Sequence, residues 1–194
     1  MTEPKARIEV IPVGFLDTNC YLIYEDDTRL AALIDPGEEP QKILRKVTEL
    51  GLTLKYIIHT HGHFDHVGAD RTIKEKTGAA ILIHQADAPM LDKVTPERLI
   101  HDGETIELSW LKLRVLHTPG HSPGGICLVG SGYVFTGDTL FQGAVGRTDL
   151  QGGNEEALFH SIREKLMSLP DGFAIYPGHG PESTIGQERK IWKS

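Results

Sequence analysis

The sequence predicts an α/β or α+β fold in which two mixed β-sheets pack face to face and helices cover their outer surfaces. Short apolar stretches bounded by glycine, proline or aspartate fall into two groups, over residues 8–83 and 105–176. Stretches with helical spacing accompany both groups, so each sheet has helices available to cover one face. No repeat, low-complexity segment or linker separates the groups. We therefore expect a single domain over residues 1–194.

The first group is expected to contain strands joined by tight turns and followed by helices. The strands are expected at residues 8–13, 20–24, 31–34, 54–58 and 79–83. Asp26-Asp27 marks a hairpin turn, and Asp35-Pro36-Gly37 stops the third strand. One helix covers residues 43–50 and ends at Gly51 in a left-handed conformation, and another covers 69–76 and ends at Gly78. A short helical segment at 85–91 and an irregular surface connection at 93–102 complete this half.

The second group has more closely spaced strands and two helices. The strands are expected at residues 105–108, 111–116, 126–129, 133–135 and 173–176. Asn154 is typical of a helix N-cap, and Glu155 and Glu156 in the first turn favour the positive end of the helix dipole. That helix carries an apolar stripe typical of core packing, formed by Leu158, Ile162, Leu166 and Leu169. A closing helix is expected at residues 184–192.

The composition is that of an ordinary globular protein, with 39% hydrophobic and 24% charged residues and a formal net charge of −7. The acidic balance and the lack of a basic stripe argue against nucleic acid as a partner. Cys20 and Cys127 are far apart, and we expect both to be buried as small apolar side chains. No apolar run approaches the ~18 residues of a membrane span, and residues 1–5 do not begin a signal peptide. We expect a cytoplasmic protein without membrane contact, either a monomer or a small homo-oligomer.

Four histidines and an aspartate lie within eight residues, at His59-Thr60-His61-Gly62-His63-Phe64-Asp65-His66. The cluster directly follows an apolar strand. Imidazole is a common metal ligand, and histidines two residues apart at a strand end point the same way. The sequence therefore predicts that His61 and His63 share one metal ion, with Asp65 and His66 within reach of a second.

Three further segments place a polar side chain just after an apolar strand and beside glycine or proline. These segments are His117-Thr118-Pro119-Gly120-His121, Thr136-Gly137-Asp138-Thr139 and Pro177-Gly178-His179-Gly180. A single glycine-flanked histidine is more often a turn residue than a ligand. Three such segments together with the histidine cluster indicate a joint metal site.

The order His-x-His-x-Asp-His, Thr-Pro-Gly-His, Gly-Asp, Pro-Gly-His-Gly resembles the metallo-β-lactamase superfamily over about Pro12 to Gln187. The resemblance implies a four-layer αβ/βα sandwich, in agreement with the strand pattern. It is strongest to short, single-domain glyoxalase II-like (hydroxyacylglutathione hydrolase-like) enzymes. Full-length glyoxalase II has a C-terminal helical domain that supplies most glutathione contacts. We expect no such domain here, so the resemblance leaves the substrate open.

Position by position, the resemblance implies seven metal ligands for two divalent ions. The first ion would take His61, His63 and His121, the second Asp65, His66 and His179, and Asp138 would bridge them. The ligand set suits zinc and also tolerates iron or manganese. A hydroxide held between the ions would attack the carbonyl carbon of a thioester or ester, which gives Asp65 and Asp138 the catalytic positions.

Arg147 follows the bridging aspartate in Gly146-Arg147-Thr148-Asp149. The resemblance implies that it contacts a substrate carboxylate of a glutathione thioester, while the alternative is a surface arginine that steadies its loop through Asp149. His59 and His117 are either groups that support the ligands or packed strand-end residues. No role is expected for His84, His101 and His160, which have no partner at a suggestive spacing.

Several other functions compete with the thioester hydrolase. A glutathione persulfide dioxygenase of the same superfamily would use a single iron on His61, His121 and Asp138. Lactonase or β-lactamase activity on the same site has no positive sign in the sequence, and the charge balance disfavours a nuclease. A purely structural metal site is disfavoured because structural zinc sites are usually closed sets of four ligands.

Overall fold

The computed structural model describes residues 6–92 and 94–192 and confirms two mixed sheets with helices outside them. The first sheet contains β1 to β6 in chain order, with antiparallel pairing up to β3 and parallel pairing from β3 to β6. Its strands are β1 (Arg7–Val13), β2 (Thr18–Tyr24), β3 (Leu30–Ile34), β4 (Thr53–Ile58), β5 (Ala80–His84) and β6 (Arg98–Ile100).

The second sheet has the order β14-β13-β10-β9-β8-β7, in which only β10 and β13 pair in parallel. Its strands are β7 (Thr105–Leu108), β8 (Leu111–His117), β9 (Ile126–Val129), β10 (Tyr133–Gly137), β13 (Ala174–Pro177) and β14 (Ser183–Thr184). A small hairpin of β11 (Leu140–Phe141) and β12 (Ala144–Val145) follows β10.

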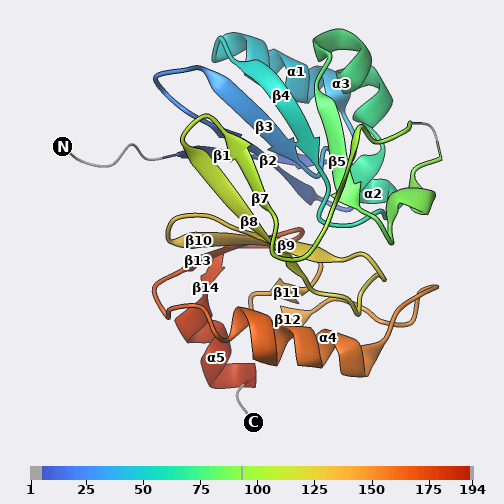
Figure 1. The fold of residues 1–194 in the computed structure, drawn as a ribbon, viewed down its shortest axis with the longest axis vertical. Coiled ribbons are helices and arrows are strands. Elements are labelled where there is room, and N and C mark those ends of the chain that lie inside the picture. The colour runs from blue at the N-terminus through green and yellow to red at the C-terminus, as the bar shows by residue number, and fades with distance from the viewer. Residues whose placement is uncertain (1–5, 93, 193–194) are drawn as a thin grey trace.

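Helices cover the outer face of each sheet, as Figure 1 shows. The helices of the first half are α1 (Pro40–Glu49), α2 (Phe64–Val67) and α3 (Asp70–Thr77), with a 3-10 turn, η1 (Ala88–Met90). In the second half, α4 (Glu155–Ser161) continues into a π-helical turn, η2 (Ile162–Leu166), and α5 (Ile185–Trp192) follows β14. In Figure 1, α1 and α3 lie above the first sheet, and α4 and α5 lie below the second.

Alternation along the strands explains the layers. On β2, Leu22 faces the core under α1 and α3, whereas Tyr21 and Ile23 face the core between the two sheets. Successive side chains of a strand point to opposite faces, so one fully apolar strand serves both cores. A third core, which includes Leu158 and Ile162, lies between the second sheet and α4. Three apolar layers therefore hold the four layers of secondary structure together.

Several expectations on individual elements are confirmed. Gly51 and Gly78 have φ values of +60° and +71° at the ends of α1 and α3. The Asn154 side chain accepts a hydrogen bond from the Ala157 N–H, as expected for an N-cap. Cys20 and Cys127 are both buried. No helix among the described residues is long and apolar enough to cross a membrane.

One expectation on the segment after β5 is wrong. The surface connection at 93–102, of which Lys93 lies outside the described residues, contains β6, a three-residue strand parallel to β5. Only Ile100 of that strand is fully buried, so the strand shows no recognisable alternation of apolar and polar residues. The short helical segment expected at 85–91 is present as the 3-10 turn η1, in which proline occupies one of the first positions, where it is tolerated.

One edge of the sandwich collects the chain segments that carry the predicted ligands. The carboxyl ends of the parallel strands β3, β4 and β5 lie together in one sheet, and those of β10 and β13 lie together in the other. The Ile126 N–H donates to the Thr60 carbonyl at 2.8 Å, which joins the two sheets at this edge. The fold therefore brings loops far apart in sequence to one place.

Candidate metal centre

All seven predicted ligands meet at this edge, from four separate loops. The loop after β4 carries His61, His63, Asp65 and His66, of which Asp65 and His66 lie on α2. His121 follows β8, Asp138 directly follows β10, and His179 follows β13. Each loop begins where a buried strand ends, so the strands fix the starting points of the ligand side chains.

His61, His63 and His121 form the first group, with one nitrogen of each ring within 4.8 Å of the others. The His63 Nδ1 atom lies 2.8 Å from the His121 Nε2 atom. The His121 Nδ1–H points the other way and donates to the Arg147 carbonyl at 2.8 Å. That bond leaves the Nε2 lone pair of His121 facing the group, as a metal ligand requires.

Asp65, His66 and His179 form the second group, also with donor atoms within 4.8 Å. The Asp65 Oδ2 atom lies 3.4 Å from His66 Nε2 and 3.3 Å from His179 Nε2. The His179 Nδ1–H donates to the Leu16 carbonyl at 3.1 Å, so its Nε2 atom faces the group. The Thr18 hydroxyl donates to Asp65 at 3.3 Å and orients that carboxylate.

Asp138 lies between the two groups. Its Oδ2 atom is 3.5 Å from His121 Nε2 and 3.6 Å from His179 Nε2, and its Oδ1 atom is 3.4 Å from His66 Nε2. A single carboxylate thus touches histidines of both groups, which is the position that a bridging ligand would occupy.

Buried atoms in this cluster fit divalent cations. Among the described residues, neither the His61 Nε2 atom nor the Asp138 Oδ1 atom has a hydrogen-bond partner, although both are buried. Burial, reinforced by the neighbouring histidines, holds the pKa of His61 well below its usual value, so its imidazole is neutral and keeps a free lone pair. Unsatisfied buried polar atoms are costly, and a cation coordinated by imidazole nitrogens and carboxylate oxygens would satisfy them.

Asp35 supports the second group, and the sequence interpretation missed it. Its buried carboxylate accepts the Thr60 N–H at 2.8 Å and the Thr60 hydroxyl at 2.6 Å, and it lies 3.0 Å from His66 Nδ1. A carboxylate behind a ligating imidazole fixes the ring and raises its basicity. The signal was available: Asp35 follows strand β3 beside Pro36 and Gly37, the same pattern that identified Asp138 and His179.

Asp87 supports the first group and was also missed. Its fully buried carboxylate accepts the Gly62 N–H at 3.0 Å, the Ser122 hydroxyl at 2.6 Å and the Gly124 N–H. These bonds tie the loop of His61 to the loop of His121. No local pattern indicates this role, because all three partners are at least 25 residues away in sequence.

His59 does not point to either group. Its Nε2 atom lies 2.8 Å from Asp70 Oδ2 and its Nδ1 atom 3.8 Å from Asp35 Oδ1, in a fully buried position. Because Asp35 in turn contacts His66, the side chain of His59 stands behind the ligands and supports them.

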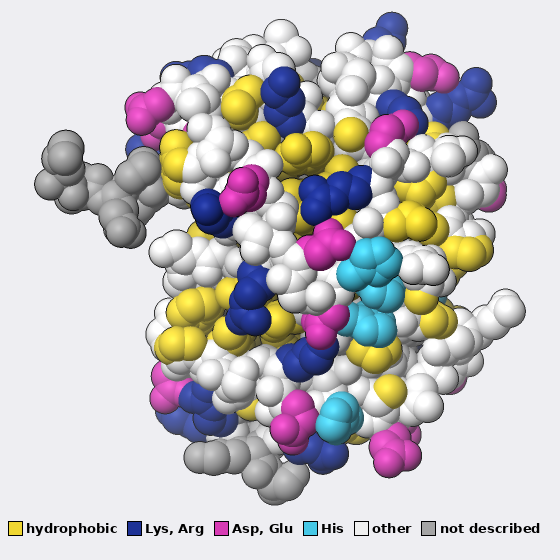
Figure 2. All heavy atoms as spheres, viewed as in Figure 1, with side chains coloured by type: hydrophobic (Ala, Val, Ile, Leu, Met, Phe, Trp, Pro, Cys, Tyr) yellow, Lys and Arg dark blue, Asp and Glu magenta, His cyan; other side chains and the backbone are white. Residues whose placement is uncertain are grey.

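Three other histidines contact one another away from the two groups. The ring of His84 stacks on that of His117 at 4.1 Å and lies 6.1 Å from that of His101, although the sequence suggested no partner for His84 or His101. His117 also bonds the Pro123 carbonyl at 2.9 Å, so it helps to shape the loop that carries His121. Figure 2 shows histidines gathered on one face among interspersed acidic and basic side chains.

The Arg147 side chain forms a two-point ion pair with Asp149, with both N–O distances at 2.7 Å. Both side chains are largely exposed. This is the contact of the loop-steadying alternative, so a substrate carboxylate would have to compete with Asp149 for the guanidinium group. The Arg147 carbonyl, by contrast, has a defined role in orienting His121.

Comparisons with known proteins identify the family of this chain. Residues 13–179 match the family model described as the metallo-beta-lactamase superfamily. The hydroxyacylglutathione hydrolase GloC of Haemophilus influenzae is 42% identical in an alignment of 203 positions that covers 95% of each chain. The probable metallo-hydrolase YqgX of Bacillus subtilis is 40% identical in an alignment of 198 positions that covers 92% of each chain.

Solved structures share the fold over nearly the whole chain. The BLEG-1 B3 metallo-beta-lactamase has a TM-score of 0.90 at 32% identity, covering 95% of this chain and 97% of that one. ETHE1 from Myxococcus xanthus has a TM-score of 0.88 at 33% identity, covering 95% and 82%. TTHA1623 in a di-iron-bound form has a TM-score of 0.85 at 36% identity, covering 94% and 98%. The chain therefore belongs to the metallo-β-lactamase superfamily, and it is a metal-dependent hydrolase.

Proposed function

We propose that this hydrolase cleaves a thioester of the S-lactoylglutathione type, with two divalent ions held by the seven clustered side chains. The observation that carries the proposal is the position of Asp138, within 3.4–3.6 Å of histidines in both groups. The similarity to a hydroxyacylglutathione hydrolase supports the substrate class. A single resident ion would leave one of the two groups without a function.

Each group would hold one ion, with Asp138 shared between them. When bound, the ions would supply an acidified water and polarise the thioester carbonyl. Zinc, iron and manganese all suit the donor set. The similar structure of TTHA1623 is of a di-iron-bound form, so iron is as reasonable a candidate as zinc.

Asp65 and Asp138 are the carboxylates that we assign to the reaction. Burial opposes ionisation of Asp65, but His179 and His66 outweigh it and lower its pKa, so this side chain is a carboxylate at neutral pH. A fixed carboxylate at this position orients a water and accepts its hydrogen bond. The Thr18 hydroxyl holds Asp65 in place.

The side chains near the site that could act as nucleophiles are otherwise engaged. The Ser122 hydroxyl donates to Asp87. Burial raises the pKa of the Cys127 thiol to about 11, so at neutral pH it is not the reactive thiolate. Attack by a water is therefore the route that these residues leave open.

A glutathione persulfide dioxygenase is the second candidate, because ETHE1 is among the similar structures. Such an enzyme would hold one iron on His61, His121 and Asp138. The second group of Asp65, His66 and His179 argues for the hydrolase. Its donor atoms lie within 4.8 Å of one another, as those of the first group do.

One preparation can test both candidates. Metal content would be measured together with S-lactoylglutathione hydrolysis and with oxygen uptake on glutathione persulfide. We expect about two ions per chain and thioester cleavage that continues without oxygen. One iron per chain with oxygen uptake and no thioester cleavage would overturn the proposal in favour of the dioxygenase.

A further inference from the structure

A cavity of about 400 Å³ lies beside α2, and nothing in the proposed reaction uses it. Phe64 and Val67 of α2 line this pocket, whereas Asp65 and His66 between them belong to the second ligand group. Met90, Leu91 and Val94 from the segment after β5 supply further apolar lining. A concave, largely apolar space of this size suits a small organic molecule.

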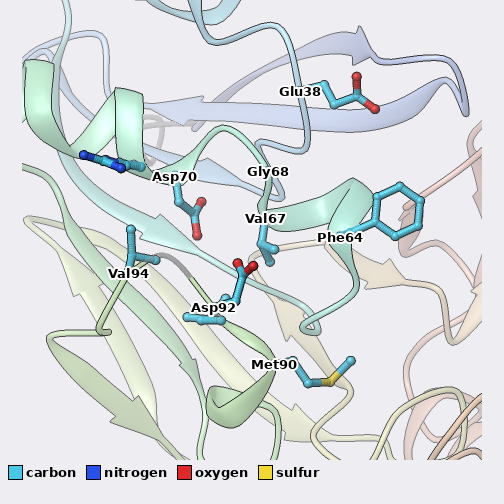
Figure 3. Close-up of a pocket in the computed structure, with 10 residues that line it drawn as sticks. Glu38, Phe64, Val67, Gly68, Asp70, Met90, Asp92 and Val94 are labelled. Carbon is cyan, nitrogen blue, oxygen red and sulfur yellow. The ribbon is translucent and has the colours of Figure 1, made fainter.

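Asp70 places an unpaired carboxylate oxygen in this pocket. The residue is only 2% exposed, and its Oδ2 atom is 2.8 Å from His59 Nε2. Its Oδ1 atom is buried and has no hydrogen-bond partner among the described residues. Figure 3 shows the Asp70 carboxylate pointing across the pocket toward that of Asp92, with Val67 beside them. A buried, unsatisfied acceptor of this kind is costly unless a ligand supplies the donor.

The charges that the described residues place around the pocket favour a cationic ligand. Glu38, Asp70 and Asp92 all line it, and the contact of Asp70 with His59 uses only the Oδ2 atom of Asp70. Arg71 also lines the pocket, but its guanidinium group is paired with Glu75 at 2.9 Å. Lys74 of the same helix is likewise paired, with Glu97.

We propose that this pocket binds a small organic cation, with a primary ammonium group between Asp70 and Asp92 and an apolar body against Val67, Met90 and Val94. The ammonium would donate to the free Asp70 oxygen, and a charge-assisted hydrogen bond in a buried position is strong. The apolar body would cover side chains that are now only half-buried.

The occupied pocket would touch the supports of both ligand groups. From Asp70, a buried series of contacts runs to His59 at 2.8 Å, to Asp35 at 3.8 Å and on to His66 at 3.0 Å. Met90 packs directly behind Gly62 in the loop of His61, so closely that a Cβ on Gly62 would lie 2.7 Å from the Met90 Cβ. The ligand could therefore be either the cationic end of a substrate or a separate effector.

Methionine methyl resonances offer a direct test, because the chain has three methionines and Met90 lines the pocket. Zinc-loaded full-length protein with ¹³C-labelled methionine methyl groups would be titrated with phenethylammonium at pH 7, where the amine is protonated and cannot coordinate zinc. The neutral 2-phenylethanol and the anionic 3-phenylpropanoate are matched probes. Met167, which is partly buried and packs against the core of the second half, is the internal control.

We expect phenethylammonium to shift the Met90 methyl resonance saturably and to bind about tenfold more tightly than the alcohol. The anionic probe should give no saturable shift, and Met167 should not respond to any of the three. A Met90 resonance that phenethylammonium leaves unchanged, or equal affinity for ammonium and alcohol, would overturn the proposal. This measurement needs no turnover, so its result does not depend on whether the proposed function is correct.

Variants at the exposed side of the pocket avoid the buried Asp70–His59 pair. Asp92→Asn should weaken phenethylammonium binding about fivefold, and Val94→Trp should abolish it by filling the pocket. Asp27→Asn removes the same charge from the distant β2–β3 turn and should leave binding unchanged. Wild-type affinity in both pocket variants would also overturn the proposal.

Inhibition of thioester hydrolysis would identify the source of the cation. If phenethylammonium raises KM alone, the pocket receives the cationic end of a substrate. If it lowers kcat alone, the pocket is a separate effector site that acts through the contacts behind His66 and His61.

Discussion

The Asp87 carboxylate accepts the Ser122 hydroxyl at 2.6 Å, and the same oxygen accepts the Gly62 N–H at 3.0 Å. Ser122 directly follows His121, and Gly62 lies between His61 and His63. One buried carboxylate thus joins the two loops that supply the first ligand group. Asp35 has the corresponding position behind His66 in the second group. Asp35 also holds Thr60, whose hydroxyl lies 3.1 Å from His61 Nδ1, so it reaches the first group as well, whereas the Asp87 contacts described above all lie on the loops of the first group.

Replacing Asp87 with asparagine should weaken metal binding at the first group selectively. The amide keeps the shape of the carboxylate but cannot accept all three hydrogen bonds, so the two loops lose their fixed spacing. Loss of such a supporting contact typically costs 10- to 100-fold in metal affinity. Stepwise removal of zinc by a chelator, followed by metal analysis, would measure the two affinities separately.

Asp35→Asn is the matched control, because it removes the same charge from behind the other group. We expect it to weaken the second ion more than the first. If both variants weakened both ions equally, the assignment of Asp87 to the first group and of Asp35 mainly to the second would be wrong.

Asp138→Ala should remove metal from both groups and reduce thioester hydrolysis by at least about 100-fold. The reason is that this carboxylate lies within 3.6 Å of histidines in both groups, so no single group is complete without it. Metal content and kcat/KM would be measured together. Asp27→Ala, in an exposed turn, is the control for a lost carboxylate. Full activity in Asp138→Ala would contradict the dinuclear site.

The residues around these ligands show what a sequence alone can predict here. His121, Asp138 and His179 are visible because each follows an apolar strand beside glycine or proline, so a local pattern indicates both strand end and ligand. Asp35 shows the same pattern, but the sequence Asp-Pro-Gly is equally well explained as the turn that ends the strand, without any role in a metal site. Asp87 and Asp70 are different, because their roles depend on partners that only tertiary packing supplies. Strand β6 was missed for a related reason: three residues on a sheet edge are too short for a period to appear.

The ion pair between Arg147 and Asp149 leads to opposite predictions for two variants. Arg147→Ala should raise KM for anionic thioesters severalfold and leave KM for neutral thioesters almost unchanged, because only an anionic substrate uses the guanidinium group. Asp149→Asn should lower KM for anionic thioesters, since it frees the guanidinium group from its two-point partner. Steady-state kinetics on one anionic and one neutral thioester would measure both. Equal effects on the two substrates would leave Arg147 with only its role in the loop.

The buried pair of His59 and Asp70 should make stability depend on pH. Burial disfavours the charged imidazole, but Asp70 and Asp35 outweigh it and raise the pKa of His59 from 6.5 to about 9. Because the folded state holds the proton more tightly than the unfolded state, the stabilisation is complete below pH 6.5 and is lost as the pH rises through 9.

His59→Gln is the variant that isolates this contribution, because glutamine still donates to Asp70 but does not titrate. Urea unfolding of the metal-free protein at pH 6 to 9.5 would give the free energy of unfolding for both forms. The wild-type value should fall by about 2–3 kcal/mol relative to the variant across this range. Parallel curves for the two proteins would mean that His59 is neutral in the folded state. In that case its contact with Asp70 would be a hydrogen bond between an uncharged imidazole and the carboxylate, and the support behind His66 would not depend on charge.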